Sequence, residues 1–377
     1  MAPTANDQAS KEPWAANRLG LDYVAEAERL GRAVRPIVDG HLHVNGERAS
    51  RVFKRVMDLY GISRIWSQTQ LASASVVREV MGDRVSFIAI PEYMAADRKH
   101  AMEEGFLENL DVWANEYGAR CVKLWHAPRF KDLIEEAGGD WDEHRMGGKW
   151  RMKVAERACE LGMMLMTHIA DPVTWFQTAY KDSSRYGTKL DQYGPLEEMM
   201  RTFDVPWLGA HLGGWPEDLG FLTGLLERHP KLILDTSATK WMVREVSKHP
   251  RDELLAFMER FRGRIIFGSD IVTHDAHLEP NKAGERKFGA ELASNEDEAF
   301  ELYASRYWAL RTMWEGDYDG ESPIADPDLA KIDPANHDAM SAPRLHGKSM
   351  PKELLEVFYG GAIESTMGVW YAEHGGV

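Results

Sequence analysis

The sequence predicts an α/β protein whose strands close into a (β/α)₈ barrel, the TIM barrel. Eight short apolar runs alternate with segments of helical periodicity, which is the pattern of parallel strands joined by helical crossovers. The runs are mostly apolar, as expected of strands that are covered on both faces. The length of 377 residues lies in the range that such barrels reach as one domain. A doubly wound open sheet is the alternative for the same alternation.

The predicted elements follow in order along the chain. An N-terminal arm over 1–34 carries a short amphipathic helix at 21–30 that wraps the barrel or a neighbouring subunit. Strands are predicted at 37–43, 62–67, 85–90, 120–125, 163–168, 206–211, 232–235 and 264–270. Helices are predicted at 49–60, 72–81, 98–117, 149–161, 196–203, 216–228, 243–262 and 297–314. In the first of them, Val52, Phe53, Val56 and Leu59 have the spacing of one helix face.

The barrel domain is predicted to span 35–314, with an extension over 315–377 that belongs to the same domain. Residues 128–148 are expected to form an irregular insertion, and a long loop bearing Trp and Tyr follows the fifth strand. The segment 315–350 is rich in Asp, Pro and Gly and is predicted to be an ordered lid or loop. A terminal helix is predicted over 351–365.

Charge and composition limit the classes of partner and the cellular location that are expected for this chain. With 45 basic and 60 acidic residues, the net charge of -15 disfavours nucleic acid and anionic membranes as partners, and it says nothing more about the substrate. A small-molecule substrate is expected. No apolar run is long enough to span a bilayer, and residues 1–10 lack a signal-peptide core, so the cytoplasm is the expected location. Cys121 and Cys159 are interpreted as buried small hydrophobes rather than a disulfide framework. A homodimer is expected.

The sequence Ile37–His43 carries two histidines separated by one leucine. Because successive strand residues point to opposite faces, His41 and His43 are predicted to present both imidazoles on one side while Leu42 faces away. Two neutral imidazoles side by side are half of a transition-metal site.

Further metal-competent side chains end the later strands. In a barrel, the carboxyl ends of all strands open on one face. The residues found at these ends are His41, His43, Lys123, His168, His211 and Asp270. Their recurrence at five strand ends is far more specific than any one of these motifs, and it predicts a metal site at this face.

These residues resemble the amidohydrolase superfamily, and in particular the amidohydrolase-related branch that includes aminocarboxymuconate semialdehyde decarboxylase. The order His-x-His, Lys, His, His, Asp carries the resemblance, together with the local sequences at 38–41, 122–124, 210–214 and 266–270. It covers about 35–270, with a weaker match over 351–365. In the final helix the family often has Gly-Asn where this chain has Gly360 and Gly361.

Three imidazoles and a carboxylate, from His41, His43, His168 and Asp270, suit Zn²⁺ or another divalent ion such as Mn²⁺. Such an ion would lower the pKa of a bound water and so generate hydroxide, with Asp270 as general base and later proton donor. The resemblance implies that His211 binds a second metal or polarises the substrate carbonyl. It also implies that Lys123 is carboxylated and bridges two ions in two-metal members, whereas an ion-paired ammonium is the alternative. One or two ions per chain are therefore expected.

Other residues are weaker candidates for substrate binding. Those in loops after strands are His126, Asp171, His274, Asp275 and His277. Those able to form an aromatic wall are Trp125, Trp175, Trp215 and Trp241. Arg48 and Arg51 would hold a substrate carboxylate, and a helix-surface location is the alternative for both. Gly213 and Gly214 would allow the backbone to approach the site closely, or simply turn the chain.

The leading functional hypothesis is a metal-dependent hydrolase of an amide, ester or lactone. A metal-dependent, non-oxidative decarboxylase of a small carboxylic acid, aromatic acids included, is the alternative, and the ligand set does not separate the two. A hydratase is a more distant third. The non-enzyme alternative is a degenerate barrel that serves as a binding or assembly module.

Overall fold

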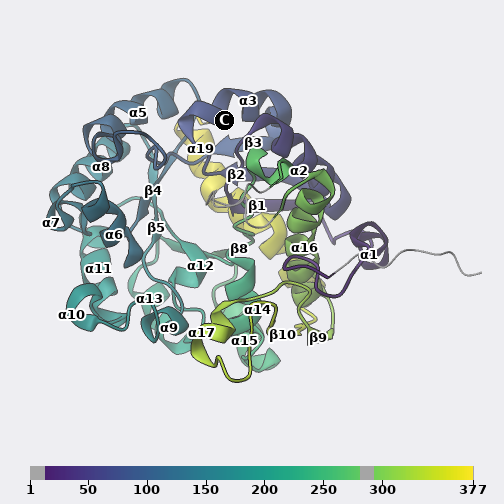
Figure 1. Cartoon of the computed structure of the whole chain (residues 1–377). Coiled ribbons are helices and arrows are strands. Elements are labelled where there is room, and N and C mark those ends of the chain that lie inside the picture. Colours follow the sequence, from purple (N-terminus) through teal and green to yellow (C-terminus); the bar gives the residue numbers. More distant parts are fainter. Residues whose placement is uncertain (1–12, 281–292, 377) are drawn as a thin grey trace, which may run out of the picture.

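The computed structural model describes residues 13–280 and 293–376. Strands lie at its centre and helices surround them in a ring (Figure 1). The central strands are β1 (Ile37–Leu42), β2 (Ile62–Ser67), β3 (Val85–Phe87), β4 (Cys121–Trp125), β5 (Met164–His168), β6 (Trp207–Gly209), β7 (Leu232–Asp235) and β8 (Ile265–Ile266). They pair in parallel and in chain order, as a three-stranded sheet β1–β3 and a five-stranded sheet β4–β8.

Isolated parallel bridges join these two sheets at both seams. Between β3 and β4, Ala89 pairs with Val122, and the Lys123 amide donates to the Ala89 carbonyl at 2.9 Å. Between β8 and β1, His43 pairs with Val272, and the His43 amide donates to the Ile271 carbonyl at 2.8 Å. The parallel pairing therefore runs around a closed ring of eight strands, in agreement with the predicted barrel rather than the open sheet.

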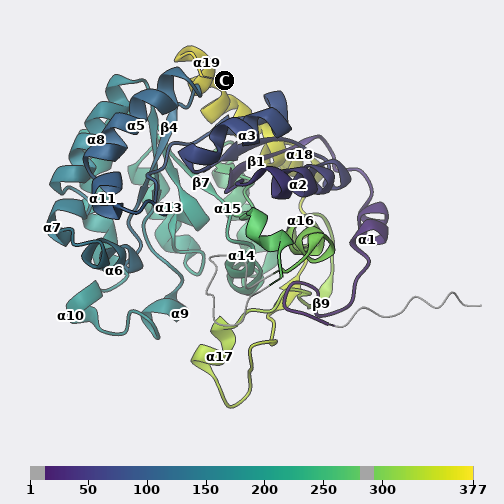
Figure 2. The same ribbon diagram turned by 45° about the horizontal axis from the view of Figure 1, so that its top comes forward.

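Side chains from all eight strands fill the interior of this ring. They form one cluster with residues of the C-terminal segment, and its strand members are Val38, Trp66, Ile88, Cys121, Met164, Met166, Leu208, Ile233 and Ile266. The C-terminal segment lies at the amino ends of the strands, because Trp370 donates to the Gly162 carbonyl and Arg120 to the His374 carbonyl. In Figure 2 this segment lies at the opposite end of the barrel from α9 (Val173–Phe176), α10 (Ser183–Tyr186) and α17 (Asp328–Ile332). One end of the barrel is thus plugged, which leaves the carboxyl ends of the strands for the site.

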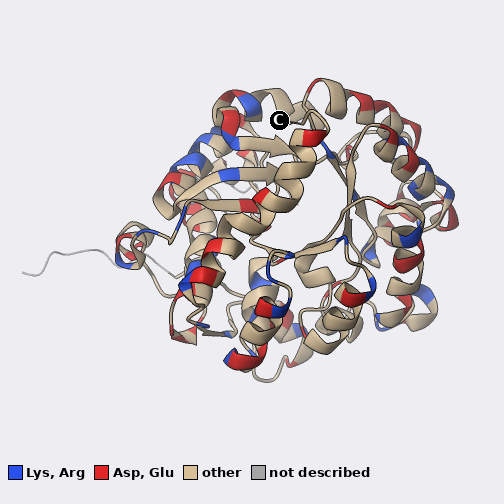
Figure 3. Cartoon of the chain, turned by 180° about the vertical axis from the view of Figure 1, so that it is seen from behind, with Lys and Arg blue, Asp and Glu red and all other residues tan. Residues whose placement is uncertain are grey.

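Amphipathic helices form the outer layer and bury their apolar faces against the strands. The longer ones are α2 (Glu47–Tyr60), α3 (Leu71–Met81), α5 (Glu104–Asn115), α8 (Lys149–Glu160), α11 (Tyr193–Thr202), α13 (Leu219–Arg228), α15 (Arg251–Arg260) and α16 (Glu296–Glu315). In α2, the predicted inward residues Val52, Phe53 and Val56 are buried. Acidic and basic side chains alternate around this layer (Figure 3). None of the described helices is long and apolar enough to cross a membrane.

Shorter elements occupy the ends and the connections. The helices are α1 (Tyr23–Leu30), η1 (Gly82–Arg84), α4 (Arg98–Met102), α6 (Arg129–Glu136), α7 (Trp141–His144), η2 (Leu190–Gln192), α12 (Ala210–Gly213), α14 (Thr239–Val246), η3 (Asp275–Leu278), α18 (Lys352–Glu356), η5 (Val357–Gly361), η6 (Glu364–Gly368) and α19 (Val369–Glu373). The chain from residue 13 to α1 lies against the extension, since the Ala325 amide donates to the Ala15 carbonyl at 2.8 Å.

Several predicted elements differ from the observed ones. The insertion over 128–148 contains helices α6 and α7 rather than irregular chain. The helix predicted over 243–262 is two helices, because Pro250 cannot continue the first and starts the second. The extension at 315–350 includes an antiparallel pair, β9 (Asp319–Glu321) with β10 (Arg344–His346), and the terminal helix runs on to Glu373 through π-helical turns.

Candidate metal centre

A local irregularity in β1 places both of its histidines in the barrel interior. The pairing register of β1 with β2 shifts between Asp39 and Leu42, as a β-bulge does. Leu42 packs into the outer hydrophobic layer, whereas the rings of His41 and His43 lie 5.7 Å apart on the other side. The predicted pair therefore does share one face.

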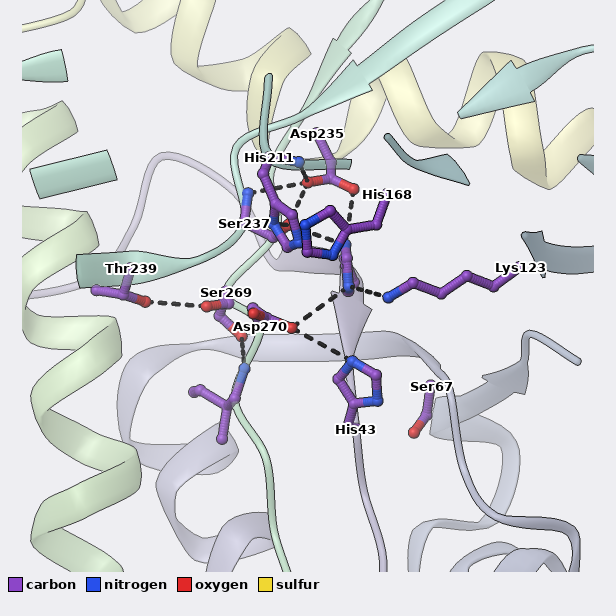
Figure 4. A network of polar contacts seen from close by, with 12 residues as sticks. His43, Ser67, Lys123, His168, His211, Asp235, Ser237, Thr239, Ser269 and Asp270 are labelled. Atoms are coloured by element: carbon purple, nitrogen blue, oxygen red, sulfur yellow. Dashed lines mark hydrogen bonds and ion pairs between the residues drawn. The ribbon is translucent and has the colours of Figure 1, made fainter. Parts of the chain in front are cut away.

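Asp270 brings these two imidazoles to a common point. Its Oδ1 lies 3.4 Å from His41 Nε2 and 3.3 Å from His43 Nε2 (Figure 4). These three donor atoms lie within 4.8 Å of one another, a spacing that could hold a metal ion. The His41 side chain is sealed from solvent, while those of His43 and Asp270 keep 24% and 28% of their exposure. A small molecule can therefore approach the donors from the side of His43 and Asp270.

Asp235, at the end of β7, fixes the orientation of His41. Its Oδ2 lies 2.8 Å from His41 Nδ1, and both side chains are fully buried. A carboxylate can only accept, so Nδ1 carries the proton and the lone pair of Nε2 faces the donor group. Burial alone would raise the pKa of Asp235, but the adjacent His41 holds it below its usual range.

The sequence analysis missed Asp235 and its neighbour Ser237. The Ser237 hydroxyl contacts His41 Nδ1 at 2.8 Å and His211 Nδ1 at 2.7 Å, so it links two imidazoles. Asp235 ends the predicted seventh strand, and applying the strand-end rule there would have found it. His41, His211 and Asp235 also form a second group that could hold an ion, but both carboxylate oxygens of Asp235 are already engaged, Oδ2 by His41 and Oδ1 by Ser237 and the His211 amide.

We expect Asp235→Asn to weaken metal binding about 10- to 100-fold, because an amide holds the Nδ1 proton of His41 less firmly than a carboxylate does. Competition with a chromogenic chelator measures this change, with Asp204→Asn as a surface control that binds as the wild type does. An unaltered metal affinity in Asp235→Asn would show that Asp235 does not orient a ligand.

His168 and His211 lie next to this group, with ring centroids 4.4 Å apart. His168 Nε2 lies 2.8 Å from Asp171 Oδ1, and the Tyr180 hydroxyl donates to Asp171 Oδ2 at 2.6 Å. His168 belongs to neither three-donor group in the described part of the chain, and Nδ1 is the nitrogen that its bond to Asp171 leaves free. Likewise the Ser237 contact leaves Nε2 of His211 free. Each buried imidazole thus has one nitrogen occupied, the arrangement typical of metal-ligating histidines.

Strained backbone is concentrated at these strand ends. Of five non-glycine residues with positive φ in the described chain, four follow β6, β7 and β8: His211 (58°), Leu212 (50°), Ala238 (69°) and Asp270 (59°). Such conformations cost energy and cluster at functional sites. Gly214 also has φ 76°, and a Cβ there would lie 2.7 Å from the Ala170 carbonyl oxygen, so this turn needs glycine.

The protonation states suit a cation. Burial lowers the pKa of His43 to about 4, so its imidazole is neutral near pH 7. Burial would raise the pKa of Asp270, but the hydrogen bond with His43 and the nearby imidazoles hold it well below its usual range. Neutral imidazoles beside an ionised carboxylate are the forms that bind a metal.

Lys123 extends into the interior from β4. Its Nζ lies 3.4 Å from His41 Nε2, and no carboxylate of the described residues lies within 4.0 Å of it. The ion-paired ammonium considered from the sequence is therefore absent from the described chain. Burial lowers the pKa of Lys123 to about 8, which increases the neutral amine, the form that carboxylation requires. Its carboxylation stays a prediction.

Three of the predicted substrate-binding residues lie on the protein surface. Arg48 and Arg51 lie on the surface of α2, each 60% exposed, where they pair with Glu279 and Glu47. His274 is exposed and its Nδ1 accepts from the Ala276 amide, capping η3. Helix periodicity puts both arginines on the solvent side of α2, which favours the helix-surface alternative over a carboxylate-binding role.

The predicted aromatic residues also differ in whether they lie near the imidazoles. Trp215 packs on Phe221 at 4.3 Å and on Tyr193, as part of the outer layer. His126 is buried and stacks on Trp141 at 5.0 Å. Trp125, in contrast, lies beside His168 with centroids 6.4 Å apart.

Trp241 lies even closer to the imidazoles and forms a second aromatic wall. Its ring is 6.0 Å from that of His168 and 5.4 Å from that of His211. Trp175 packs against Trp241 in turn, at 6.0 Å. An open groove of about 480 Å³ borders this wall, and Trp175, Tyr180 and Lys331 are among its lining residues.

Comparisons with known proteins give structural likenesses only. No family model matches this chain, and no curated protein matches it. Among solved structures, it is similar to a zinc-bound amidohydrolase from Burkholderia multivorans, with 11% identity, 89% of this chain and 99% of that one covered, and a TM-score of 0.41. A manganese-bound 5-carboxyvanillate decarboxylase from Novosphingobium aromaticivorans shows 9% identity, coverage of 91% and 97%, and a TM-score of 0.42. Both likenesses extend over most of this chain and almost all of the other chain.

Proposed function

We propose that this chain is a metal-dependent hydrolase that acts on an amide, ester or lactone. One observation carries the proposal: the Nε2 atoms of His41 and His43 converge on a single oxygen of Asp270 at the open end of the barrel. Structural ion pairs do not require two imidazoles beside one carboxylate that keeps part of its solvent exposure. A catalytic metal site requires both the donors and the access.

The donor set fits a divalent ion such as Zn²⁺ or Mn²⁺. His41, His43 and Asp270 would hold it, with His168 as a further ligand through its free Nδ1. When bound, such an ion supplies Lewis acidity, which polarises a carbonyl and lowers the pKa of water. Whether Lys123 and His211 hold a second ion is a prediction that the metal count per chain decides.

Asp270, His211 and Asp235 would have different roles in the reaction. Asp270 is ionised and partly exposed, so it would take a proton from the attacking water and return it to the leaving group. Because the single hydroxyl proton of Ser237 goes to Asp235 Oδ1, the neutral His211 donates from Nδ1 to Ser237, and the lone pair of its Nε2 would bind an ion rather than donate to the substrate. Asp235 keeps His41 in one orientation throughout, so no ligand has to reorganise during the reaction.

A decarboxylase is the second candidate, and Lys123 is the observation that favours it. A buried ammonium without a carboxylate of the described chain beside it would accept the carboxylate of a substrate. In that reaction the C–CO₂ bond breaks, its electron pair stays on the substrate carbon, and that carbon takes a proton. A turnover screen of aryl lactones, anilides, aryl esters and aromatic carboxylic acids separates the two, because the decarboxylase releases CO₂ and the hydrolase consumes water. Release of CO₂ without any hydrolysis would overturn the leading proposal.

Arg48→Ala and Arg51→Ala are expected to change kcat/KM by less than about 2-fold, since exposed surface pairs contribute little. Steady-state kinetics on the best substrate of the screen measures this. A loss of 10-fold or more in either variant would mean that α2 approaches the substrate in the working enzyme.

We also propose that the enzyme works in the cytoplasm as a homodimer on a small-molecule substrate. The net charge of -15 disfavours nucleic acid as a partner, because both molecules are negatively charged. Sedimentation equilibrium tests the dimer, and a monomer at micromolar concentration would contradict it.

A further inference from the structure

The loop after β5 folds back so that one of its own side chains contacts His168. Asp171 lies three residues beyond His168, and its Oδ1 is 2.8 Å from His168 Nε2. The other oxygen of Asp171 accepts from the Tyr180 hydroxyl at 2.6 Å. Asp171 and Tyr180 are both buried, so little water competes for either bond. Two short hydrogen bonds thus join His168 to the far end of this loop.

The directions of these two bonds select one tautomer of His168. Burial and the charge of Asp171 raise the pKa of Tyr180, so its hydroxyl stays protonated and is the donor. Because the carboxylate of Asp171 accepts in both bonds, the proton of the neutral His168 ring lies on Nε2. The two ring nitrogens point in different directions, and the lone pair of Nδ1 therefore faces away from the loop.

Contacts within the protein hold the Tyr180 ring in place. It packs against Trp175, Phe176 and Tyr186, with centroids 5.7, 5.4 and 5.2 Å away. Trp175 is itself fixed, since its indole Nε1 donates to Asp328 Oδ2 in α17 at 2.8 Å. The extension thus helps to fix the hydroxyl that faces the carboxylate.

The start of the loop is anchored to the segment after β6. The Val173 amide donates to Glu217 Oε1 at 2.5 Å, and the buried Lys189 pairs with Glu217 Oε2 at 3.0 Å. The Ala170 backbone packs so closely on Gly214 that no side chain fits between them. A support that is itself anchored in this way holds a ligand in one orientation before an ion binds.

The charge of Asp171 is not balanced by a cationic side chain. No Lys or Arg of the described chain lies within 4.0 Å of its carboxylate, whose polar side-chain partners are His168 and Tyr180. A buried carboxylate that lacks a cationic partner is costly. A cation at Nδ1 of His168 would strengthen the Nε2–H donor and so offset this cost.

We infer that Asp171 and Tyr180 are positioning residues, which act on the metal through His168 by keeping its Nδ1 free and directed away from the loop. The inference rests on the proposed function, because it concerns the ion of that same site. It gives Asp171 a role other than the substrate contact expected from the sequence. Tyr180 acts one step further out, by holding the carboxylate in the orientation that His168 requires.

The test measures the affinity for Co²⁺ and the visible absorption spectrum of the cobalt-loaded protein, and neither readout depends on turnover. Asp171→Asn should weaken cobalt binding about 10- to 100-fold, because an amide can donate to Nε2 as well as accept from it and no longer selects the tautomer. Tyr180→Phe keeps the carboxylate and should weaken binding about 5-fold. At saturating cobalt, the spectrum of Asp171→Asn should shift toward that of His168→Ala, which a loss of stability alone would not cause.

Tyr186→Phe is the matched control for Tyr180→Phe. The Tyr186 hydroxyl donates to Asp132 at 3.0 Å, and its ring packs on that of Tyr180. The control therefore removes the same atom from the same loop without touching the contacts of His168. It should keep the wild-type affinity and spectrum, and urea unfolding of both Phe variants shows whether their stabilities differ.

The double variant His168→Ala/Asp171→Asn tests whether Asp171 acts through His168. It should bind cobalt no more weakly than His168→Ala alone, because the effect of Asp171 depends on the imidazole. Additive losses would overturn the inference, as would wild-type affinity and spectrum in both Asp171→Asn and Tyr180→Phe. Failure of the hydrolase proposal looks different: the variants then change cobalt binding as expected, but the wild type turns over no substrate of the screen.

Discussion

Replacement of Asp270 by asparagine is expected to lower kcat/KM by about 10³-fold or more and to lower the metal content of the purified protein. The carboxylate oxygen contacts both His41 and His43, so its negative charge is common to both contacts. Asparagine keeps the shape of the side chain but neither attracts a cation nor takes a proton. Steady-state kinetics and elemental analysis on the same preparation measure both effects.

Asp275→Asn is the control for this substitution. Asp275 follows the same strand, and its Oδ1 accepts from the Ala49 amide, a role that the asparagine oxygen can keep. This variant should retain metal and activity within about 2-fold, because it leaves the donor group untouched. Wild-type activity in Asp270→Asn would exclude Asp270 as the general base.

His41→Ala is expected to abolish metal binding and to destabilise the fold by about 3 kcal/mol, because it also removes the imidazole that pairs with Oδ2 of the buried Asp235. The double variant His41→Ala/Asp235→Ala removes that carboxylate as well, so it should recover part of the stability but none of the metal. Urea unfolding and elemental analysis give the two quantities separately.

His144→Ala separates metal loss from destabilisation. His144 is likewise buried, and its Nε2 lies 3.1 Å from Glu103 Oε1, far from the barrel interior in α7. This variant should also unfold at a lower urea concentration and yet keep its metal. If His144→Ala lost metal to the same extent as His41→Ala, destabilisation alone would account for both results.

The ring of strands could be predicted because a strand that is buried on both faces has a short, mostly apolar sequence. It predicted His41, His43 and Asp270 because a barrel collects its strand ends on one face. The insertion helices α6 and α7 were missed, since a short helix packed on a loop shows no long periodicity.

The hydrogen-bond partners of the predicted ligands were harder to predict from the sequence than the residues at the strand ends. Asp235 and Ser237 act through His41, and a contact between residues nearly 200 positions apart leaves no local pattern. Arg48 and Arg51 lie on the helix surface because the loop after β1 is short and α2 begins at Glu47.

The most direct test of a metal bound by His41, His43 and Asp270 is the number of divalent ions per chain in protein purified without chelator. The proposed ligation predicts about one or two equivalents in the wild type and less than about one tenth of that in His41→Ala and Asp270→Asn. Full metal retention in both variants would contradict it.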